Sequence, residues 1–402
     1  MKTITHIDCF SGPGGICTGF RASGIKTVLA IEKVESCVET YTANHSVPVI
    51  HKDIREVTEQ DIRQFVKGEV DILTSGMPCE TFSTAGSKSR SFYDHRQFLF
   101  MEAIRIAEIV NAKMILFENV PAITTKKIEK NGEKLIVQEI FEQLEKHGYK
   151  YHIDVILNSA DFGVPQYRER YFILASKLKK DLHVPAPLMQ GHVTVKEALI
   201  DLPSVEANSK KEAKNYLNID SAYTRLMKDN NFWKLDQPVT EITYHLPPNH
   251  REGTLRRFSM INQGEGLKDL FDKLSPEEIE KLQGERVLPK KWYIQRNRRL
   301  KADQPSVTVT SHCLDELLHP FENRSLTVRE VARLQGFPDN YDFRGGPFIC
   351  PHIYETQDKY EQIGDAVPPL LAYHWGKTIQ EILKEKAKND IESCGLLYSE
   401  VQ

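Results

Sequence analysis

The sequence has no apolar stretch that approaches the roughly 18 to 20 residues needed to cross a bilayer, which argues against a membrane-spanning protein. Its N-terminus, at residues 1–6, lacks the apolar segment of a signal peptide. The seven cysteines are odd in number, and they include neither a C-x-x-C pair nor a Cys/His spacing typical of zinc sites. The sequence therefore predicts a cytoplasmic protein with reduced thiols, without a membrane anchor or a metal.

An excess of basic charge is also missing, since the formal net charge is -3. The steering of a charged partner depends on local patches more than on the total, so this value does not exclude a nucleic acid. The chain has 402 residues, 40% of them hydrophobic, and one core seldom extends over more than about 250 to 300 residues. We therefore expect two domains.

Short apolar runs alternate with amphipathic stretches over the first 175 residues or so. The runs that we predict to be strands cover residues 4–10, 28–31, 70–73, 114–117, 155–157 and 171–175, and apolar positions recur with helical spacing across residues 98–110. This alternation predicts an α/β fold with a doubly wound, mostly parallel sheet and a ligand site beyond the carboxyl ends of its strands.

The pattern changes after residue 180, where prolines interrupt a stretch of weak periodicity. Helical features return when Thr327 and Glu330 form a Thr-x-x-Glu capping box and Gly336 is placed to end the helix. A last helix is expected over about residues 369–387. We predict a first domain at residues 1–180, a smaller loop-rich domain at 181–324, and a return segment at 325–402 that completes the first domain.

Two side chains that could take part in catalysis come after two of the predicted strands. Cys79 lies in the Gly/Pro-containing segment GMPCETFS at residues 76–83, and Glu118 directly follows the run 114–117. If these two strands are parallel neighbours, both side chains emerge at the same edge of the sheet. A single cysteine is more often a small buried hydrophobe than a nucleophile, so the other motifs must decide.

Three further motifs accompany this pair, namely DCFSGPGG at residues 8–15, QYRER at 166–170 and QIGDAVPP at 362–369. In this order the set resembles the C5-cytosine DNA methyltransferases, and the resemblance covers nearly the whole chain. It implies the S-adenosylmethionine-dependent methyltransferase fold, with residues 181–324 as a target-recognition domain.

A glycine turn and two acids form the candidate cofactor site. Gly12, Gly14 and Gly15 follow a predicted strand and precede a helix, so the backbone can approach a ligand closely. Glu32 ends the second strand about 17 residues later, near the offset at which a carboxylate takes ribose hydroxyls. A nicotinamide dinucleotide is the alternative ligand, but the third glycine of its fingerprint is absent.

The resemblance implies S-adenosyl-L-methionine as the cofactor. It places Phe10 on the adenine ring, Glu32 on the ribose and Asp53 on the adenine amine. Pro78 and Leu99 would line the site, and Asp365 is assigned to the same pocket. Without the resemblance, each acid reads as a solvated surface carboxylate.

The resemblance also implies the chemistry. Cytosine C5 is a poor nucleophile, so Cys79 would add to C6 while a protonated Glu118 holds N3, and burial at the end of an apolar strand would raise the pKa of Glu118. Arg168 would favour the Cys79 thiolate. Asn119 and Val120 would hold the base, which must be flipped out of a DNA duplex.

The alternating motif Gln166-x-Arg168-x-Arg170 would direct three side chains to one face, where they can hold phosphate or Glu118. A second basic region lies at residues 286–301, which contain aromatic but no acidic side chains. Basic side chains among aromatics suit a DNA backbone, although a solvated face is the ordinary explanation. From this region we select Arg296, Arg298 and Arg299 as DNA contacts.

Two positions depart from the common family pattern, because Glu80 stands where glutamine is frequent and Asp365 where asparagine is usual. The favoured function is a DNA (cytosine-5-)-methyltransferase of a restriction-modification system, with double-stranded DNA as substrate and a cognate restriction endonuclease as a second partner. The alternatives are an RNA cytosine methyltransferase, a non-catalytic DNA-binding protein, and a thiol hydrolase that uses His95 or His147. The sequence does not specify the DNA target, the preference for hemimethylated sites or the oligomeric state.

Overall fold

The computed structural model describes residues 3–77, 98–128, 132–189, 191–235, 238–345 and 356–384. Within these ranges one sheet of seven strands has the order β3-β2-β1-β4-β5-β7-β6. The strands are β1 (Thr5–Cys9), β2 (Lys26–Glu32), β3 (Val49–His51), β4 (Ile72–Ser75), β5 (Met114–Asn119), β6 (Tyr151–Asn158) and β7 (Glu169–Ser176). Only β7 runs antiparallel to its neighbours in this sheet, so the predicted mostly parallel sheet is confirmed.

The central strands are apolar on both sides, which is why their sequences read as continuous runs. In β5, Met114 and Leu116 belong to one hydrophobic core, and Ile115 and Phe117 belong to another. Both faces of the sheet are therefore buried.

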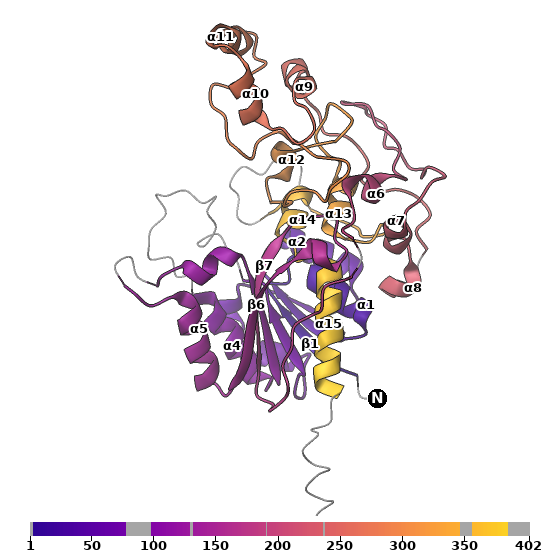
Figure 1. Cartoon of the computed structure of the whole chain (residues 1–402). Helices are drawn as coiled ribbons and strands as arrows, with labels where there is room; N and C mark the ends of the chain where they lie inside the picture. Colours follow the sequence, from indigo (N-terminus) through magenta and orange to yellow (C-terminus); the bar gives the residue numbers. More distant parts are fainter. Residues whose placement is uncertain are drawn as a thin grey trace, which may run out of the picture.

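Helices cover these two faces (Figure 1). On one face the core includes α4 (Leu99–Ile109) and α5 (Ile136–Lys146), with the shorter α3 (Glu59–Arg63). On the other face it includes α1 (Gly15–Ser23) and α15 (Pro369–Lys384), while α2 (Glu35–Asn44) packs beside α1. The sheet is thus doubly wound, as predicted.

Helix α15 brings the end of the chain back to its beginning, where it lies beside α1 (Figure 1). The contact is close, because a Cβ built on Gly19 of α1 would lie 2.2 Å from the carbonyl oxygen of Pro369. The predicted helix over residues 369–387 corresponds to α15, whose described part ends at Lys384.

The remaining elements lie mainly above the carboxyl edge of the sheet in the view of Figure 1. They are α6 (Val195–Leu199), α7 (Ala222–Met227), α8 (Asn230–Trp233), α9 (Glu252–Ser259), α10 (Leu267–Lys273), α11 (Pro276–Gly284), α12 (Cys313–Glu316), α13 (Val328–Gln335) and α14 (Lys359–Asp365), with the short pair β8 (Arg298–Arg299) and β9 (Leu317–Leu318). Helices α9 to α11 share a small separate core. Helix α13 shares a larger core with α6 and α7.

The capping signals of α13 are confirmed. The Thr327 side chain accepts from the Glu330 amide, Glu330 accepts from the Thr327 amide, and Gly336 ends the helix at φ 86°. The proposed limits of the domains stay a prediction. No helix of the described residues is long and apolar enough to span a membrane.

Candidate active site

The ends of β1, β4 and β5 meet at the carboxyl edge of the sheet. Residues Cys9 and Ser75 are paired, and Ser75 is paired with Phe117, so the residues that follow these strands are neighbours. A Cβ built on Gly76 would lie 3.6 Å from Glu118 Oε2 and 3.9 Å from the carbonyl oxygen of Phe10. A joint site of Cys79 and Glu118 requires that β4 and β5 pair in parallel. This pairing is confirmed.

Cys79 itself lies outside the described residues, as does Pro78. The chain is described up to Met77, two residues before the thiol, and Asn119 Nδ2 donates to the carbonyl oxygen of Met77 at 3.4 Å. Asn119 is 3% exposed, and its Oδ1 accepts from the amide of Val120 at 2.9 Å. Asn119 therefore ties the end of β5 to the strand end that leads to Cys79.

Glu118 forms an ion pair with Arg170, whose Nε lies 3.0 Å from Glu118 Oε1. Arg170 directly precedes Tyr171, which is paired with Asn119 across the antiparallel strands β5 and β7. Burial raises the pKa of Glu118, and the positive charges of Arg170 and Arg168 oppose this effect without cancelling it. The site thus combines a buried carboxyl with an adjacent cation.

Gln166 and Arg168 face the interior, whereas Tyr167 between them is 40% exposed. Arg168 donates to the carbonyl oxygens of Val309 at 2.6 Å and Gly364 at 2.8 Å. Gln166 donates to Gln335 Oε1 at 2.6 Å, and its own Oε1 accepts from the Val309 amide. Of the three alternating side chains, Arg170 pairs with Glu118, while the other two hydrogen-bond to distant segments of the chain.

The glycine turn before α1 is held by Glu32. The Gly12 amide donates to Glu32 Oε2 at 2.8 Å, and Glu32 Oε1 accepts from the amides of Lys33 and Val34. Gly12 and Gly14 have left-handed backbones, with φ of 52° and 98°, which glycine adopts at little cost. The carboxylate at the end of β2 is therefore attached to the turn after β1.

At two of the three glycine positions, neighbouring protein atoms leave no room for a Cβ atom. A Cβ on Gly15 would lie 2.1 Å from the carbonyl oxygen of Val367, and one on Gly14 would lie 2.8 Å from the hydroxyl of Tyr341. The sequence suggests room for a ligand at all three positions, but His45 and Tyr341 occupy that space at Gly14, and the return segment occupies it at Gly15. Among the described residues, no atom would lie within 4 Å of a Cβ on Gly12. Of the three glycines, Gly12 is therefore the one without a described neighbour at its Cβ position.

The other candidate cofactor residues lie on different elements. Asp53 accepts from Arg55 Nε at 2.9 Å and Nη2 at 2.6 Å, and these bonds lower the pKa of Asp53 to about 2. Leu99 begins α4 and is buried. Asp365 ends α14 and accepts from Gln357 Nε2 at 2.9 Å. Phe10 follows β1 with a φ of 56°.

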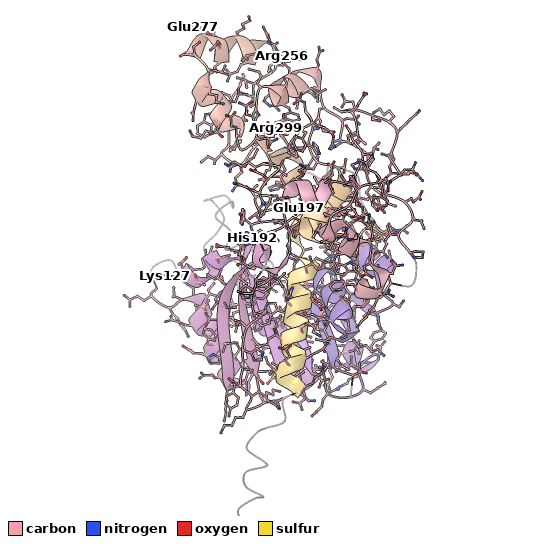
Figure 2. All side chains as sticks on the ribbon, turned by 45° about the vertical axis from the view of Figure 1, so that its right-hand side comes forward. Lys127, His192, Glu197, Arg256, Glu277 and Arg299 are labelled. Atoms are coloured by element: carbon pink, nitrogen blue, oxygen red, sulfur yellow. The ribbon has the colours of Figure 1, made fainter. Side chains whose placement is uncertain are left out.

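The basic side chains of residues 296–299 differ in environment. Arg299 is 5% exposed, and its guanidinium donates to the carbonyl oxygens of Ile261, Phe258 and His319, among others. In Figure 2 it lies below Arg256, nearer to the middle of the molecule. Arg296 pairs with Asp315 at 3.1 Å, and Arg298 is half-buried. The structure therefore gives Arg299 an internal role that its sequence position does not indicate.

Sequence reasoning did not identify Val367 or Tyr341 as neighbours of the turn. Val367 belongs to a motif that the sequence shows, but its contact with Gly15 depends on how α15 packs. Tyr341 has no local signal at all. Among the described residues, no group of three or more His, Cys, Asp or Glu side chains could hold a metal ion.

This sheet and its strand-end site define an α/β protein of the methyltransferase class. The chain matches the C-5 cytosine-specific DNA methylase family over residues 4–381, so it belongs to that family. The protein is accordingly an enzyme that methylates DNA at cytosine C5.

Relatives agree with this assignment. The chain is 32% identical to the Type II methyltransferase M.DdeI of Desulfomicrobium norvegicum, over 91% of this chain and 86% of the relative. It is 30% identical to the Type II methyltransferase M1.HphI of Haemophilus parahaemolyticus, over 92% of this chain and 85% of the relative. A solved structure described as a DNA modification methyltransferase encoded within an Escherichia coli prophage superposes with a TM-score of 0.71. The two chains are 25% identical, and the superposition covers 95% of this chain and 100% of the other.

Proposed function

We propose that the protein methylates C5 of a cytosine flipped out of double-stranded DNA, with Cys79 as nucleophile and S-adenosylmethionine as methyl donor. The pairing of Glu118 with Arg170, beside the strand end that leads to Cys79, carries this proposal. Bound S-adenosylmethionine would supply an electrophilic methyl group.

Cys79 would act on the ring that receives the methyl group. The thiolate adds to C6, which places electron density on C5, and Glu118 donates a proton to N3 as this happens. When C5 receives the methyl group, the electrons of the broken sulfur–methyl bond would stay on the donor, which would leave as a neutral thioether. A base then removes the C5 proton and the C6–S bond breaks. The thiolate is thereby regenerated, and N3 returns its proton to Glu118.

Arg170 would position Glu118 for this proton transfer. A protonated carboxyl is needed at N3, and burial moves the pKa of Glu118 in that direction. The ion pair at 3.0 Å limits the rise and fixes the orientation of the carboxyl group. Asn119 and Val120 would support the base, and Arg168 would act on the thiolate through its charge.

The lack of any described atom within 4 Å of a Cβ on Gly12 fits a cofactor beside the Glu32 carboxylate. The Glu32 carboxylate accepts hydrogen bonds from three backbone amides. It would bind ribose hydroxyls through the lone pairs of its oxygens that these amides leave free. Phe10, Asp53, Pro78, Leu99 and Asp365 complete the proposed site, together with Gly12, Gly14 and Gly15.

Duplex DNA would contact Arg296 and Arg298, with Arg170 at the edge of the site. Gln166, which the sequence suggested as a DNA contact, is fully buried and hydrogen-bonded to Gln335 and Val309, so it would support this surface from inside. Arg299 would support this surface from inside, because its guanidinium bonds internal carbonyls. Proposed limits are residues 1–180 and 325–402 for the catalytic domain and 181–324 for the target-recognition domain. The names of the relatives support a restriction-modification system, with an endonuclease that cuts the same site.

The test is methyl transfer from labelled S-adenosylmethionine to unmethylated plasmid DNA, with RNA in parallel and methylated positions mapped by sequencing. We expect 5-methylcytosine at one short recurrent DNA motif. Methylation of RNA alone, or of neither nucleic acid, would contradict the proposal.

Variants test the roles of the two catalytic side chains. Cys79→Ala and Glu118→Gln should lower transfer by at least about 10²-fold with the fold retained. Cys313→Ala is the matched control, because Cys313 is a buried thiol in α12, and it should retain activity. DNA that carries 5-fluorocytosine should trap a covalent adduct with the wild type but not with Cys79→Ala, because a C5 fluorine cannot leave as a proton does.

A further inference from the structure

The glycine turn at residues 12–14 is held by one side chain at each of its three residues. Glu32 accepts from the Gly12 amide, the Tyr341 hydroxyl donates to the Pro13 carbonyl oxygen, and Thr18 Oγ1 donates to the Gly14 carbonyl oxygen at 2.8 Å. Glu32 and Thr18 lie on the elements that adjoin the turn. Tyr341 alone comes from the distant return segment.

The Tyr341 side chain is buried in a cluster of aromatic rings next to the turn. Its side chain is 1% exposed, and its ring packs against Phe337 at 4.7 Å and Phe343 at 5.1 Å between centroids. The fully buried Arg329 donates through Nη2 to the Tyr341 carbonyl oxygen at 3.2 Å. The hydroxyl therefore reaches Pro13 from a fixed frame.

His45 completes the arrangement and defines where the protons lie. A hydroxyl has one proton, and Tyr341 donates it to the Pro13 carbonyl oxygen. His45 Nε2 lies 3.1 Å from the Tyr341 oxygen, so Nε2 must carry the proton of that second hydrogen bond. His45 Nδ1 then accepts, and Arg21 Nη1 lies 3.4 Å from it as a donor. Burial and the charge of Arg21 lower the pKa of His45 well below its usual range, which agrees with a neutral ring.

The adjacent contacts show that the turn has little freedom on this side. A Cβ on Gly14 would lie 2.7 Å from His45 Nε2 and 2.8 Å from the Tyr341 hydroxyl. Gly14 is thus in close contact with these two side chains, whereas at Gly12, at the other end of the turn, no described atom would lie within 4 Å of a Cβ. Without the hydroxyl, the Pro13 carbonyl would lose its buried donor, and a buried acceptor without a partner is costly.

We propose that Tyr341 is a positioning residue for the methyl donor: its hydroxyl fixes the glycine turn in the conformation that binds S-adenosylmethionine. This inference rests on the proposed use of the turn as the cofactor site. Tyr341 contacts the turn and not the reacting atoms, so its loss weakens cofactor binding and leaves the chemical step intact.

The experiment compares Tyr341→Phe with Tyr360→Phe in the full chain. The first variant removes only the hydroxyl and keeps the ring in its aromatic cluster. Tyr360 is an equally buried tyrosine, and its hydroxyl donates to the Leu326 carbonyl oxygen at 2.8 Å, away from the turn. Both variants lose one buried hydroxyl bond to a backbone carbonyl, and Tyr341→Phe also loses the bond that the Tyr341 oxygen accepts from His45 Nε2.

We expect the Kd for S-adenosylmethionine, measured by calorimetry, to rise about tenfold in Tyr341→Phe and to stay within about twofold in Tyr360→Phe. At saturating S-adenosylmethionine, kcat and the Kd for plasmid DNA should be unchanged in both variants. Peptides that span residues 12–15 should exchange amide hydrogens faster in Tyr341→Phe, while α15 keeps its protection.

An unchanged Kd and unchanged exchange at the turn in Tyr341→Phe would overturn the inference, as would an equal loss of affinity in the two variants. A fall in kcat without a change in Kd would also overturn it, because that result would give Tyr341 a role in the chemical step. Failure of the wild type to bind S-adenosylmethionine would instead overturn the proposed cofactor site, and the inference with it.

Discussion

The guanidinium of Arg170 lies 3.0 Å from the carboxylate of Glu118, across the antiparallel pair of β5 and β7. Arg168, two residues earlier in the same motif, instead donates to backbone carbonyls of the segments at Val309 and Gly364. The two arginines therefore contact different parts of the molecule. Arg170 pairs with the candidate acid, whereas Arg168 joins the strand to the rest of the fold and affects Glu118 only through its charge.

The ion pair predicts a change in pH dependence when Arg170 is replaced. A cation favours the ionised carboxyl, so Arg170→Gln should raise the pKa of Glu118 further. Since the protonated form is the proposed acid, the loss of activity with rising pH should move to higher pH. Because the carboxyl also loses its orientation, kcat at the optimum should fall about 10²-fold. The measurement is kcat against pH.

Arg225→Gln is the control for that experiment, because Arg225 forms an exposed ion pair with Asp220. Its profile should coincide with that of the wild type. If the profile of Arg170→Gln also coincided with that of the wild type, the assignment of Arg170 to Glu118 would be wrong.

The contact of the glycine turn with the return segment predicts the effect of adding one methyl group. In Gly15→Ala the new Cβ would lie 2.1 Å from the Val367 carbonyl oxygen, so backbone must shift. We expect a loss of about 1–3 kcal/mol or more in the free energy of unfolding, as for other overpacked sites. In Gly284→Ala, at the end of α11, no atom lies within 4 Å, and stability should change by less than about 1 kcal/mol. Urea unfolding would compare the two variants, and equal stabilities would rule out the contact as the reason for glycine.

The buried pair of Glu330 and Arg324 predicts a loss of stability in acid. Glu330 Oε1 and Oε2 accept from Arg324 Nη2 and Nη1, both at 2.8 Å, and the two side chains are almost fully buried. Burial would raise the pKa of Glu330, but the charge and hydrogen bonds of Arg324 outweigh it and hold this pKa well below its usual range. The stabilisation is therefore present above the unfolded-state pKa, about 4.3, and is lost as the pH falls below it.

Glu330→Gln should lower the free energy of unfolding at pH 7 by up to about 3–5 kcal/mol, because the buried Arg324 loses one of its two carboxylate partners and keeps only Glu322. The difference from the wild type should narrow as the pH is lowered below about 4. Urea unfolding at several pH values would measure it. A difference that stayed constant from pH 7 to pH 3 would show that the charge of Glu330 is not the cause.

The two neighbouring arginines of β8 should behave differently. Arg298→Ala should weaken DNA binding and lower the slope of affinity against salt concentration by about one, as expected for a single phosphate contact. Arg299→Ala should lower the melting temperature, because it leaves the carbonyls of Ile261 and Phe258 without their donor. Salt titrations and thermal melts of both variants would test this. A reduced salt slope with unchanged melting temperature in Arg299→Ala would contradict the internal role.

Local sequence pattern was sufficient for six of the seven strands of the large sheet, for the capped helix α13 and for the order of the motifs. The prediction missed β3 (Val49–His51), which has only three residues. Strands buried on both faces read as apolar runs, and a capping box such as that of Thr327 and Glu330 acts within one turn of helix. The proximity of Glu118 to the end of β4, the strand that precedes Cys79 in the sequence, followed from parallel pairing alone. The role of Cys79 stays a prediction, since it lies outside the described residues.

Tertiary packing decided the rest, because it joins residues that are far apart in the sequence. Which arginine meets Glu118 depends on the pairing of β7 with β5, and the burial of Arg299 depends on the loops that surround β8. Gly14 is in close contact with His45 and with Tyr341, which follows α13, and Gly15 is in close contact with Val367, just before α15. The residue types at a site can therefore be read locally, but their partners follow from the long-range contacts that close the fold.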